Sequence, residues 1–299
     1  MKRTLVSLLG IGLMLAMCMA ASADAVLFSD SYTVSGNSWD INYEYNSGAR
    51  QGGSLGPLQY TENPFSTPRV DPNINDGHLD QLSQVDADGA IGAMSLFSTG
   101  NWGNDFKYAW ASPNYNFKNW TNLTIEFDVN PTVSGVVPPS GFGVGMSFGS
   151  DVQGAYFFPG SGSYGNPVSP SGGLGIALAE DGRIICFSDP DHTAVWGNVP
   201  LHSGFYHFKV TIDTAGYGGG QSAHCRYWVD GIAIHDFVRA GGLNNNYITL
   251  GSESINGNIM QTAFDNLVIT TTVVPEPSAL AGLFTGLAGV CGLVIRRRK

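Results

Sequence analysis

Two stretches of alternating apolar and polar residues limit the fold of this chain more than any other feature. One runs from Leu123 to Asn130 and the other from Tyr206 to Asp213. Successive side chains of a strand point to opposite faces, so each stretch has one apolar face and one wet face. Both are predicted to be half-buried strands, and no strong helical period competes with them between Val26 and Val273.

Asp-Gly pairs mark two hairpins, at Asp181-Gly182 and Asp230-Gly231. The pair suits a type I′ turn, in which both central residues need positive φ. Strands are expected beside these turns at 174–180, 183–187, 225–229 and 232–237, and elsewhere at 26–34, 58–61, 78–82, 91–97, 142–148, 247–252 and 263–271. So many short strands predict an all-β domain over residues 26–273, a jelly-roll β-sandwich of two antiparallel sheets. About 250 residues suffice for one such domain with a full core.

Both ends of the chain have the layout of export signals. Lys2 and Arg3 precede an apolar run that closes in small residues near Ala25, so residues 1–25 are predicted to be a helical signal peptide. Residues 274–299 hold a second uncharged run, 279–295, which as a helix rising ~1.5 Å per residue just spans a ~30 Å hydrocarbon core. The basic cluster that follows is expected to stop transfer and stay cytoplasmic, which puts the domain outside. It consists of Arg296, Arg297, Arg298 and Lys299.

This tail resembles the PEP-CTERM sorting signal. Pro275, Glu276 and Pro277 precede the apolar helix and the terminal arginines, in the order of that family. There, an exosortase, which is a membrane cysteine protease, recognises and removes the tail, usually in bacteria that make extracellular polysaccharide. The resemblance implies an exported protein anchored in the membrane until processing and then found at the cell surface or in the extracellular matrix. An ordinary single-pass anchor is the alternative.

The second half of the domain resembles the concanavalin A-like, or LamG-like, jelly roll of lectins and glucanases. The resemblance is carried by the segment 205–213, the hairpin 227–232 and the closing segment 264–269. It covers about half of the domain and implies the same sandwich that the alternation predicts.

Charge excludes one class of partner. Six of the 14 Lys and Arg residues lie in the two end segments, as do Asp24 and Glu276, so the domain has eight basic residues against 22 acidic ones, a net charge of −14. Such a chain repels phosphate backbones, so nucleic acid is excluded, whereas neutral sugars and cation-bridged acidic glycans remain compatible. Cys186 and Cys225 are the cysteines outside the predicted signals. Export permits a disulfide between them, and two small core residues are the alternative.

A carboxylate motif lies on the first of the two alternating strands. Glu126 and Asp128 share a face, as in the E-x-D-x-E or E-x-D-x-x-E motif of laminarinase-like glycoside hydrolases, to which the segment is similar. Asn130 and Pro131 stand where that motif has its acid/base Glu. A retaining mechanism needs a second carboxyl group to protonate the leaving oxygen. The sequence therefore predicts a polar outer strand face and no catalysis.

Alternating oxygen ligands at Asp71, Asn73 and Asn75 are a candidate Ca²⁺ site. Asp76 stands where an EF-hand-type loop needs Gly and Leu82 where it needs Glu, so an ordinary turn is the alternative. The histidines of the last third lack the spacing of a zinc site, and we expect them at the surface.

Aromatic side chains gather in two polar regions. Trp102, Trp110 and Trp120 lie among asparagines, and Trp196 lies close to Asn198. Flat rings pack against sugars while amides bind their hydroxyls, so these residues are candidates for carbohydrate binding, with core packing as the alternative. The function predicted is a non-catalytic matrix or surface protein that binds extracellular polysaccharide. A glycoside hydrolase or lyase on the same fold, and a purely structural coat protein, are the alternatives.

Overall fold

The computed structural model describes residues 23–32, 42, 45–46, 48, 50, 52–63, 81–85, 94–99, 107–131, 143–150, 174–179, 182–188, 195–241, 243–254 and 259–273. Residues 26–271 form one compact unit, and the two ends, 1–25 and 272–299, form another. The predicted sorting motif, the basic cluster and nearly all of the predicted signal peptide lie outside the described residues.

Within the described ranges, no helix has the length and apolar character needed to cross a membrane.

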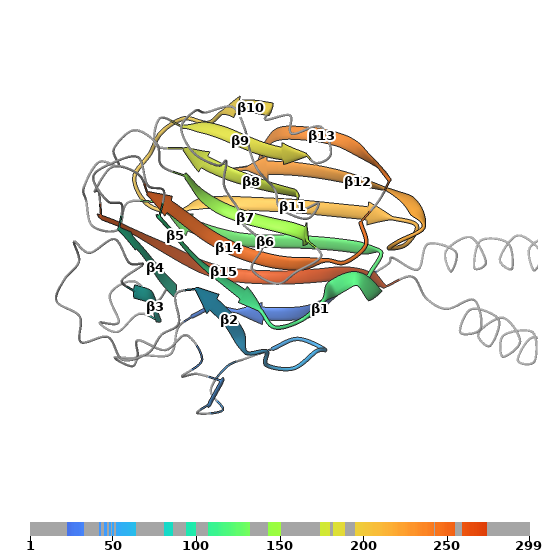
Figure 1. The fold of residues 1–299 in the computed structure, drawn as a ribbon, viewed down its shortest axis with the longest axis horizontal. Helices are drawn as coiled ribbons and strands as arrows, with labels where there is room; N and C mark the ends of the chain where they lie inside the picture. Colours follow the sequence, from blue (N-terminus) through green and yellow to red (C-terminus); the bar gives the residue numbers. More distant parts are fainter. Residues whose placement is uncertain are drawn as a thin grey trace, which may run out of the picture. The chain divides into compact units, whose positions relative to one another are not determined.

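Two antiparallel sheets make up the described domain (Figure 1). The front sheet has the order β13-β12-β11-β6-β15-β4-β3, with β1 also paired to β15, and the back sheet has the order β10-β9-β8-β7-β14-β5-β2. The front strands are β1 (Ala23–Asp30), β3 (Gln81–Val85), β4 (Met94–Thr99), β6 (Asn122–Asn130), β11 (Tyr206–Thr214), β12 (Gly220–Val229), β13 (Ile232–Gly241) and β15 (Ile259–Val273). The back strands are β2 (Tyr60–Asn63), β5 (Lys107–Pro113), β7 (Gly143–Ser150), β8 (Leu174–Ala179), β9 (Arg183–Ser188), β10 (Val195–Asn198) and β14 (Tyr247–Ser254).

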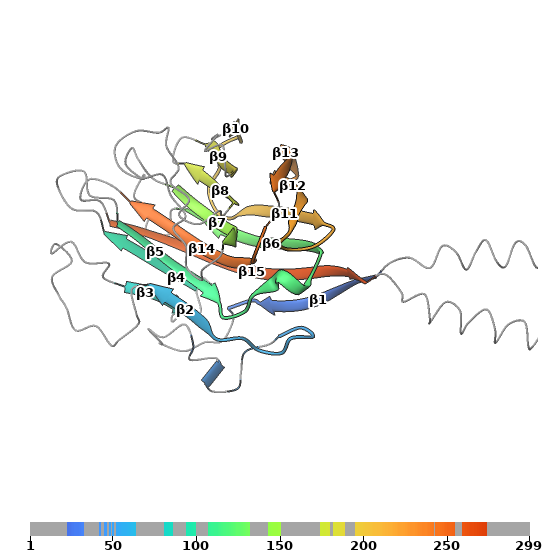
Figure 2. The same cartoon turned by 45° about the vertical axis from the view of Figure 1, so that its right-hand side comes forward.

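The chain crosses repeatedly between the two layers, which Figure 2 shows from an oblique direction. It passes from β4 in the front sheet to β5 in the back, returns to β6, and crosses again to β7. The last crossing joins β14 to β15. Strands that neighbour each other within a sheet are thus often distant in sequence, as in a jelly roll. The predicted all-β sandwich of two antiparallel sheets is confirmed.

The core lies between the sheets and is built from the apolar faces of the alternating strands. On β6 the odd-numbered residues are buried, and on β11 the even-numbered ones. Phe127 of β6 and Phe208 of β11 are both fully inaccessible to solvent. Their rings stack with centroids 5.0 Å apart, and Phe264 of β15 lies 6.1 Å from Phe127. Aromatic pairs at such distances add to the free energy gained from burial alone.

Every strand expected from the sequence overlaps a strand of the structure, but β5 and β10 were not expected. At Ala111, Ser112 and Pro113 of β5 successive residues are all buried, so the alternation that identifies a half-exposed strand is missing. The hairpin turn is confirmed at Asp230 (φ 51°) and Gly231 (φ 74°).

Candidate functional site

The front sheet presents an ordered polar surface on its outer face. The back sheet differs, because β8 is buried at each of its residues. In an antiparallel pair, residues directly opposite each other share a face. The register therefore sorts the outward side chains of β12, β11, β6 and β15 into rows that run across the strands.

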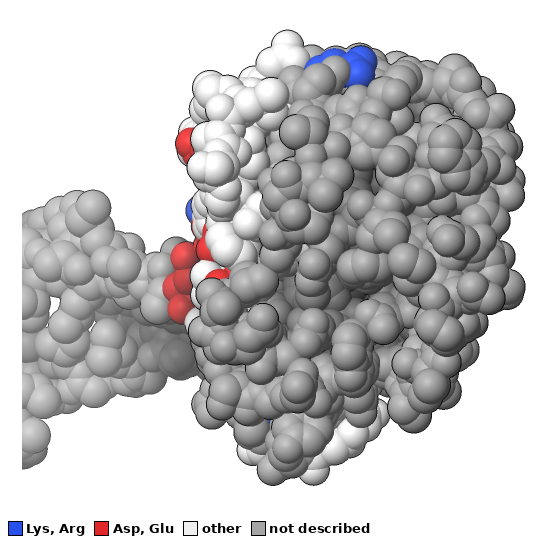
Figure 3. Space-filling model, turned by 90° about the vertical axis from the view of Figure 1, so that its left-hand side faces the viewer, with Lys and Arg blue, Asp and Glu red and all other residues white. Residues whose placement is uncertain are grey.

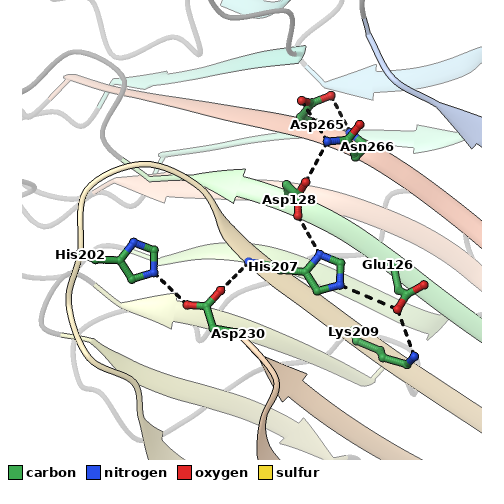
Figure 4. Close-up of polar contacts among 8 residues, drawn as sticks. All are labelled: Glu126, Asp128, His202, His207, Lys209, Asp230, Asp265 and Asn266. Carbon is green, nitrogen blue, oxygen red and sulfur yellow. Dashed lines mark hydrogen bonds and ion pairs between the residues drawn. The ribbon is translucent and has the colours of Figure 1, made fainter.

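The first row joins three strands by hydrogen bonds (Figure 4). His207 of β11 lies opposite Asp128 of β6, which lies opposite Asp265 of β15. His207 Nδ1 donates to Asp128 Oδ1 at 2.8 Å, and Asn266 Nδ2 donates to Asp128 Oδ2 at 2.8 Å and to Asp265 Oδ2 at 3.2 Å. Both oxygens of Asp128 are thereby held in place, which fixes the carboxylate at the centre of the row.

An irregularity in the β15–β6 pairing lies next to Asp265, at one end of this row. The β15–β6 register shifts between Asp265 and Val268, and Asn266 adopts φ 50°, which Asn tolerates better than most residues. Asp265 Oδ1 accepts from Asn266 N at 2.6 Å. Burial raises the pKa of the Asp265 carboxyl to about 6; the hydrogen bond from Asn266 N opposes the increase and the Asp128 charge adds to it.

The second row adds an aromatic ring to the charges. Trp228 of β12 lies opposite Lys209 of β11, which lies opposite Glu126 of β6. Lys209 Nζ is 3.1 Å from Glu126 Oε1, and His207 Nε2 of the first row is 3.8 Å from the same oxygen. The side chains of Lys209 and Glu126 are 40% and 32% exposed, so this ion pair faces solvent. Trp228 is half-buried beside it.

The β12–β13 turn closes the surface beyond His207. Asp230 Oδ1 accepts from His207 N at 2.8 Å, and its Oδ2 accepts from His202 Nε2 at 2.9 Å. The His202 ring stacks on Tyr206, with centroids 3.9 Å apart. The hydrogen bond that His202 donates to Asp230 raises the pKa of His202. These contacts tie the segment before β11 to the turn and fix the border of the surface.

The two aromatic regions predicted from the sequence lie apart in the structure, as far as their residues are described. Trp110 is in β5, whereas Trp196 and the exposed Asn198 are in β10, five strands away in the back sheet. Strands are ~4.8 Å apart, so about 24 Å separates them. Trp120 is half-buried and packs against the hydrophobic core, and Trp102 lies outside the described residues.

The other predicted sites are a Ca²⁺ site and a disulfide. Asp71, Asn73 and Asn75 fall outside it, and within it no group of three or more His, Cys, Asp or Glu residues is placed to hold a metal ion. Cys186 of β9 and Cys225 of β12 are both buried free thiols, and burial raises the pKa of each to about 12. Their pairing, like the calcium site, stays a prediction.

Sequence reasoning missed Trp228, His207 and Asp265 as members of one surface. The alternation did contain part of the signal, because Trp228 follows Arg226 and His224 at two-residue intervals, and the buried Cys225 and Tyr227 lie between them. Their partners come from cross-strand register, which the sequence does not display.

Comparisons with known proteins give only distant likenesses. No protein-family model matches the chain, and no curated protein matches it. Among solved structures, the carbohydrate recognition domain of Emp47p is 11% identical, with a TM-score of 0.47, covering 85% of this chain and 99% of that one. A protein of unknown function with a galectin-like fold from Bacillus subtilis is 12% identical, with a TM-score of 0.41, covering 64% and 88%. Lectin I-B4 from Griffonia simplicifolia, in a metal-free form, is 11% identical, with a TM-score of 0.38, covering 61% and 89%.

At these identities the likeness supplies no argument about a ligand, and the fold assignment rests on strand pairing. The described domain is a two-sheet antiparallel β-sandwich with an ordered polar surface on its front sheet.

Proposed function

We propose that this protein is a non-catalytic carbohydrate-binding protein of the bacterial envelope, and that it binds its ligand on the outer face of the front sheet. One observation carries the proposal: Trp228, Lys209 and Glu126 lie in register on three adjacent strands, next to the row of His207 and Asp128. An aromatic ring beside fixed donors and acceptors is the usual composition of a sugar site.

Charge pairing favours a neutral glycan. Lys209 is paired with Glu126, and the His207 ring is hydrogen-bonded to Asp128, so both of these basic side chains already have carboxylate partners. Figure 3 shows several Asp and Glu side chains gathered on the described part of one face. An acidic polysaccharide would have to displace these carboxylates or bring a cation with it.

A glycan microarray probed with the full-length chain tests this function, with calcium in one arm and chelator in the other. We expect binding to neutral glycans in both arms, and a loss of at least tenfold for Trp228→Ala. Trp110→Ala, which removes a half-buried ring from the back sheet, is the matched control and should bind like wild type. Binding that Trp228→Ala retains and Trp110→Ala loses would move the site to the back sheet.

A glycoside hydrolase is the second candidate, because Asp265 supplies the further carboxyl group that the β6 motif lacks. Its pKa of about 6 is that of an acid able to donate a proton near neutral pH. Against this role, Asn266 Nδ2 bonds to both Asp265 and Asp128 and so occupies the space between them. We expect no reducing sugar from β-glucan, galactan or xylan. Turnover that is lost on Asp265→Asn would make the hydrolase the leading function.

Export and sorting are the second part of the proposal, and they rest on the sequence of the two ends. The chain is secreted through its signal peptide, held by the segment 279–295, and processed by an exosortase at the Pro275-Glu276-Pro277 motif. Replacing both prolines by alanine should leave an unprocessed form in the inner membrane. Normal maturation of that variant, seen by fractionation and mass spectrometry, would contradict the sorting role.

A further inference from the structure

A second polar cluster lies on the same outer face, further along β12 from Trp228. Arg226 of β12 lies opposite Asp236 of β13, with Arg226 Nε 3.7 Å from Asp236 Oδ2. Arg226 Nη2 donates to His224 Nδ1 at 2.9 Å, and His224 Nε2 donates to Asp236 Oδ1. Each of the three side chains therefore contacts the other two.

These contacts fix the chemistry of the cluster. Because a guanidinium only donates, His224 Nδ1 accepts from Arg226, and His224 Nε2 carries the proton that Asp236 accepts. The hydrogen bond from His224 lowers the pKa of Asp236, which keeps that carboxyl ionised. Arg226 and Asp236 thus supply one cation and one anion, which are paired with each other. Asp236 is 66% and Arg226 36% exposed at the side chain, which leaves both open to a ligand.

The spacing relates this cluster to the first site. Trp228, Arg226 and His224 are alternate residues of β12, so at ~3.4 Å per residue the strip from Trp228 to His224 is about 14 Å long. That length exceeds one sugar ring. Short side chains flank the strip, because Thr211 of β11, whose hydroxyl oxygen is buried, is opposite Arg226, and Thr124 of β6 is opposite Thr211.

We infer that Arg226, His224 and Asp236 form a second carbohydrate subsite, so that the ligand is an internal segment of a linear neutral polysaccharide lying along β12. The inference rests on the proposed carbohydrate-binding function and adds the ligand's class and direction. Trp228 takes one sugar ring by stacking. Arg226 and Asp236 donate to and accept from the hydroxyls of a later sugar in the same chain.

A length-resolved microarray tests the inference, using β-gluco-, galacto- and xylo-oligosaccharides of two to six units and the full-length chain. For the best-bound series we expect affinity to rise at least tenfold from two units to six. Arg226→Ala and Asp236→Asn should abolish that rise while leaving two-unit binding unchanged, whereas Trp228→Ala should weaken all lengths. Lys118→Ala removes an exposed cation elsewhere and should behave like wild type.

The outcomes separate the two proposals. Equal affinity for two and six units, or equal weakening of both by Arg226→Ala, overturns the second subsite and leaves the carbohydrate-binding function standing. Failure of the wild-type chain to bind any neutral glycan overturns both. Thermal melts of each variant, expected within a few degrees of wild type, show that lost binding is not lost folding.

Discussion

Asp265 of β15 lies directly opposite Asp128 of β6, and the side-chain amide of Asn266 donates to both carboxylates. Two like charges in cross-strand register are destabilising unless one is neutralised. Burial raises the pKa of Asp265 to about 6 and the nearby Asp128 charge adds to the increase, so Asp265 is the member of the pair that gives up its charge.

The raised pKa of Asp265 predicts that the free energy of unfolding falls as pH rises. A carboxyl whose pKa is raised on folding stabilises the native state below its unfolded pKa of ~3.9, and this contribution is lost as pH rises through about 6. A shift of this size corresponds to ~3 kcal/mol for a dry group, which solvent screening reduces to about 1 kcal/mol for a half-exposed one. Asp265→Asn should therefore gain about 1 kcal/mol over wild type at pH 7 and little at pH 4.

Denaturant titrations of both proteins between pH 4 and 7 measure this difference. Asp213→Asn, which removes an exposed carboxyl from the same sheet, serves as the control and should show no such trend. A constant difference between Asp265→Asn and wild type across the pH range would mean that Asp265 ionises normally.

The His202–Asp230 contact predicts the same direction of pH dependence from a base. The raised pKa of His202 means that the contact stabilises the fold fully below the ordinary histidine pKa and is lost as pH rises through the folded value. Asp230→Asn keeps an acceptor for His207 N and a residue that tolerates φ 51°, but removes the charge. It should lower the melting temperature at pH 5.5 and leave it unchanged at pH 8.5. Titration of His202 by NMR should show its pKa falling in the variant, and an unmoved pKa would rule out the ion pair.

The fold could be predicted because one face of the front sheet is exposed to solvent and the other is buried. On β6 and β11 buried and exposed residues alternate, so apolar and polar residues alternate in the sequence as well. In the back sheet, β8 is buried throughout and carries no such period; it was identified from the Asp-Gly turn beside it. β5 had neither signal and was missed.

Of the candidate site, only the two carboxylates on β6 could be predicted from the sequence. Alternation alone puts Glu126 and Asp128 on the outer face of one strand. Their partners are set by register between distant strands: His207 is 79 residues from Asp128, and Asn266 is 138 residues from it. A single residue's slip in either pairing would turn these side chains to the other face, and nothing local in the sequence excludes that slip.

A buried ion pair near the start of the domain predicts a large effect on stability. Arg50 Nε is 3.0 Å from Asp30 Oδ2, with both side chains almost inaccessible to solvent, and Arg50 Nη1 donates to the Leu58 carbonyl at 2.8 Å. Its guanidinium also lies 4.7 Å from the centre of the Tyr60 ring. Arg50→Met leaves the Asp30 charge buried without this partner, which typically costs ~3–5 kcal/mol.

The double variant Asp30→Leu/Arg50→Met distinguishes the charge from the packing. Removing both charges should recover much of the loss in a denaturant titration, because a buried pair offsets little more than its own desolvation. If the double variant is as unstable as Arg50→Met, the contacts of Arg50 with Leu58 and Tyr60 carry the stability instead.

The alternation on β11 gives the most direct test of the sandwich. Phe208 points inward, is fully buried and stacks on Phe127, whereas the neighbouring Lys209 points outward with its side chain 40% exposed. Truncating a buried Phe to Ala typically costs ~3–5 kcal/mol through lost transfer energy and the cavity that remains. An exposed Lys→Ala change usually stays within about 0.5 kcal/mol, and the Lys209 pair with Glu126 adds no more than about 1 kcal/mol. The midpoints of Phe208→Ala and Lys209→Ala in a denaturant titration should therefore separate clearly. Equal midpoints would show that β11 does not have one buried and one wet face, and the proposed binding surface on the front sheet would lose its support.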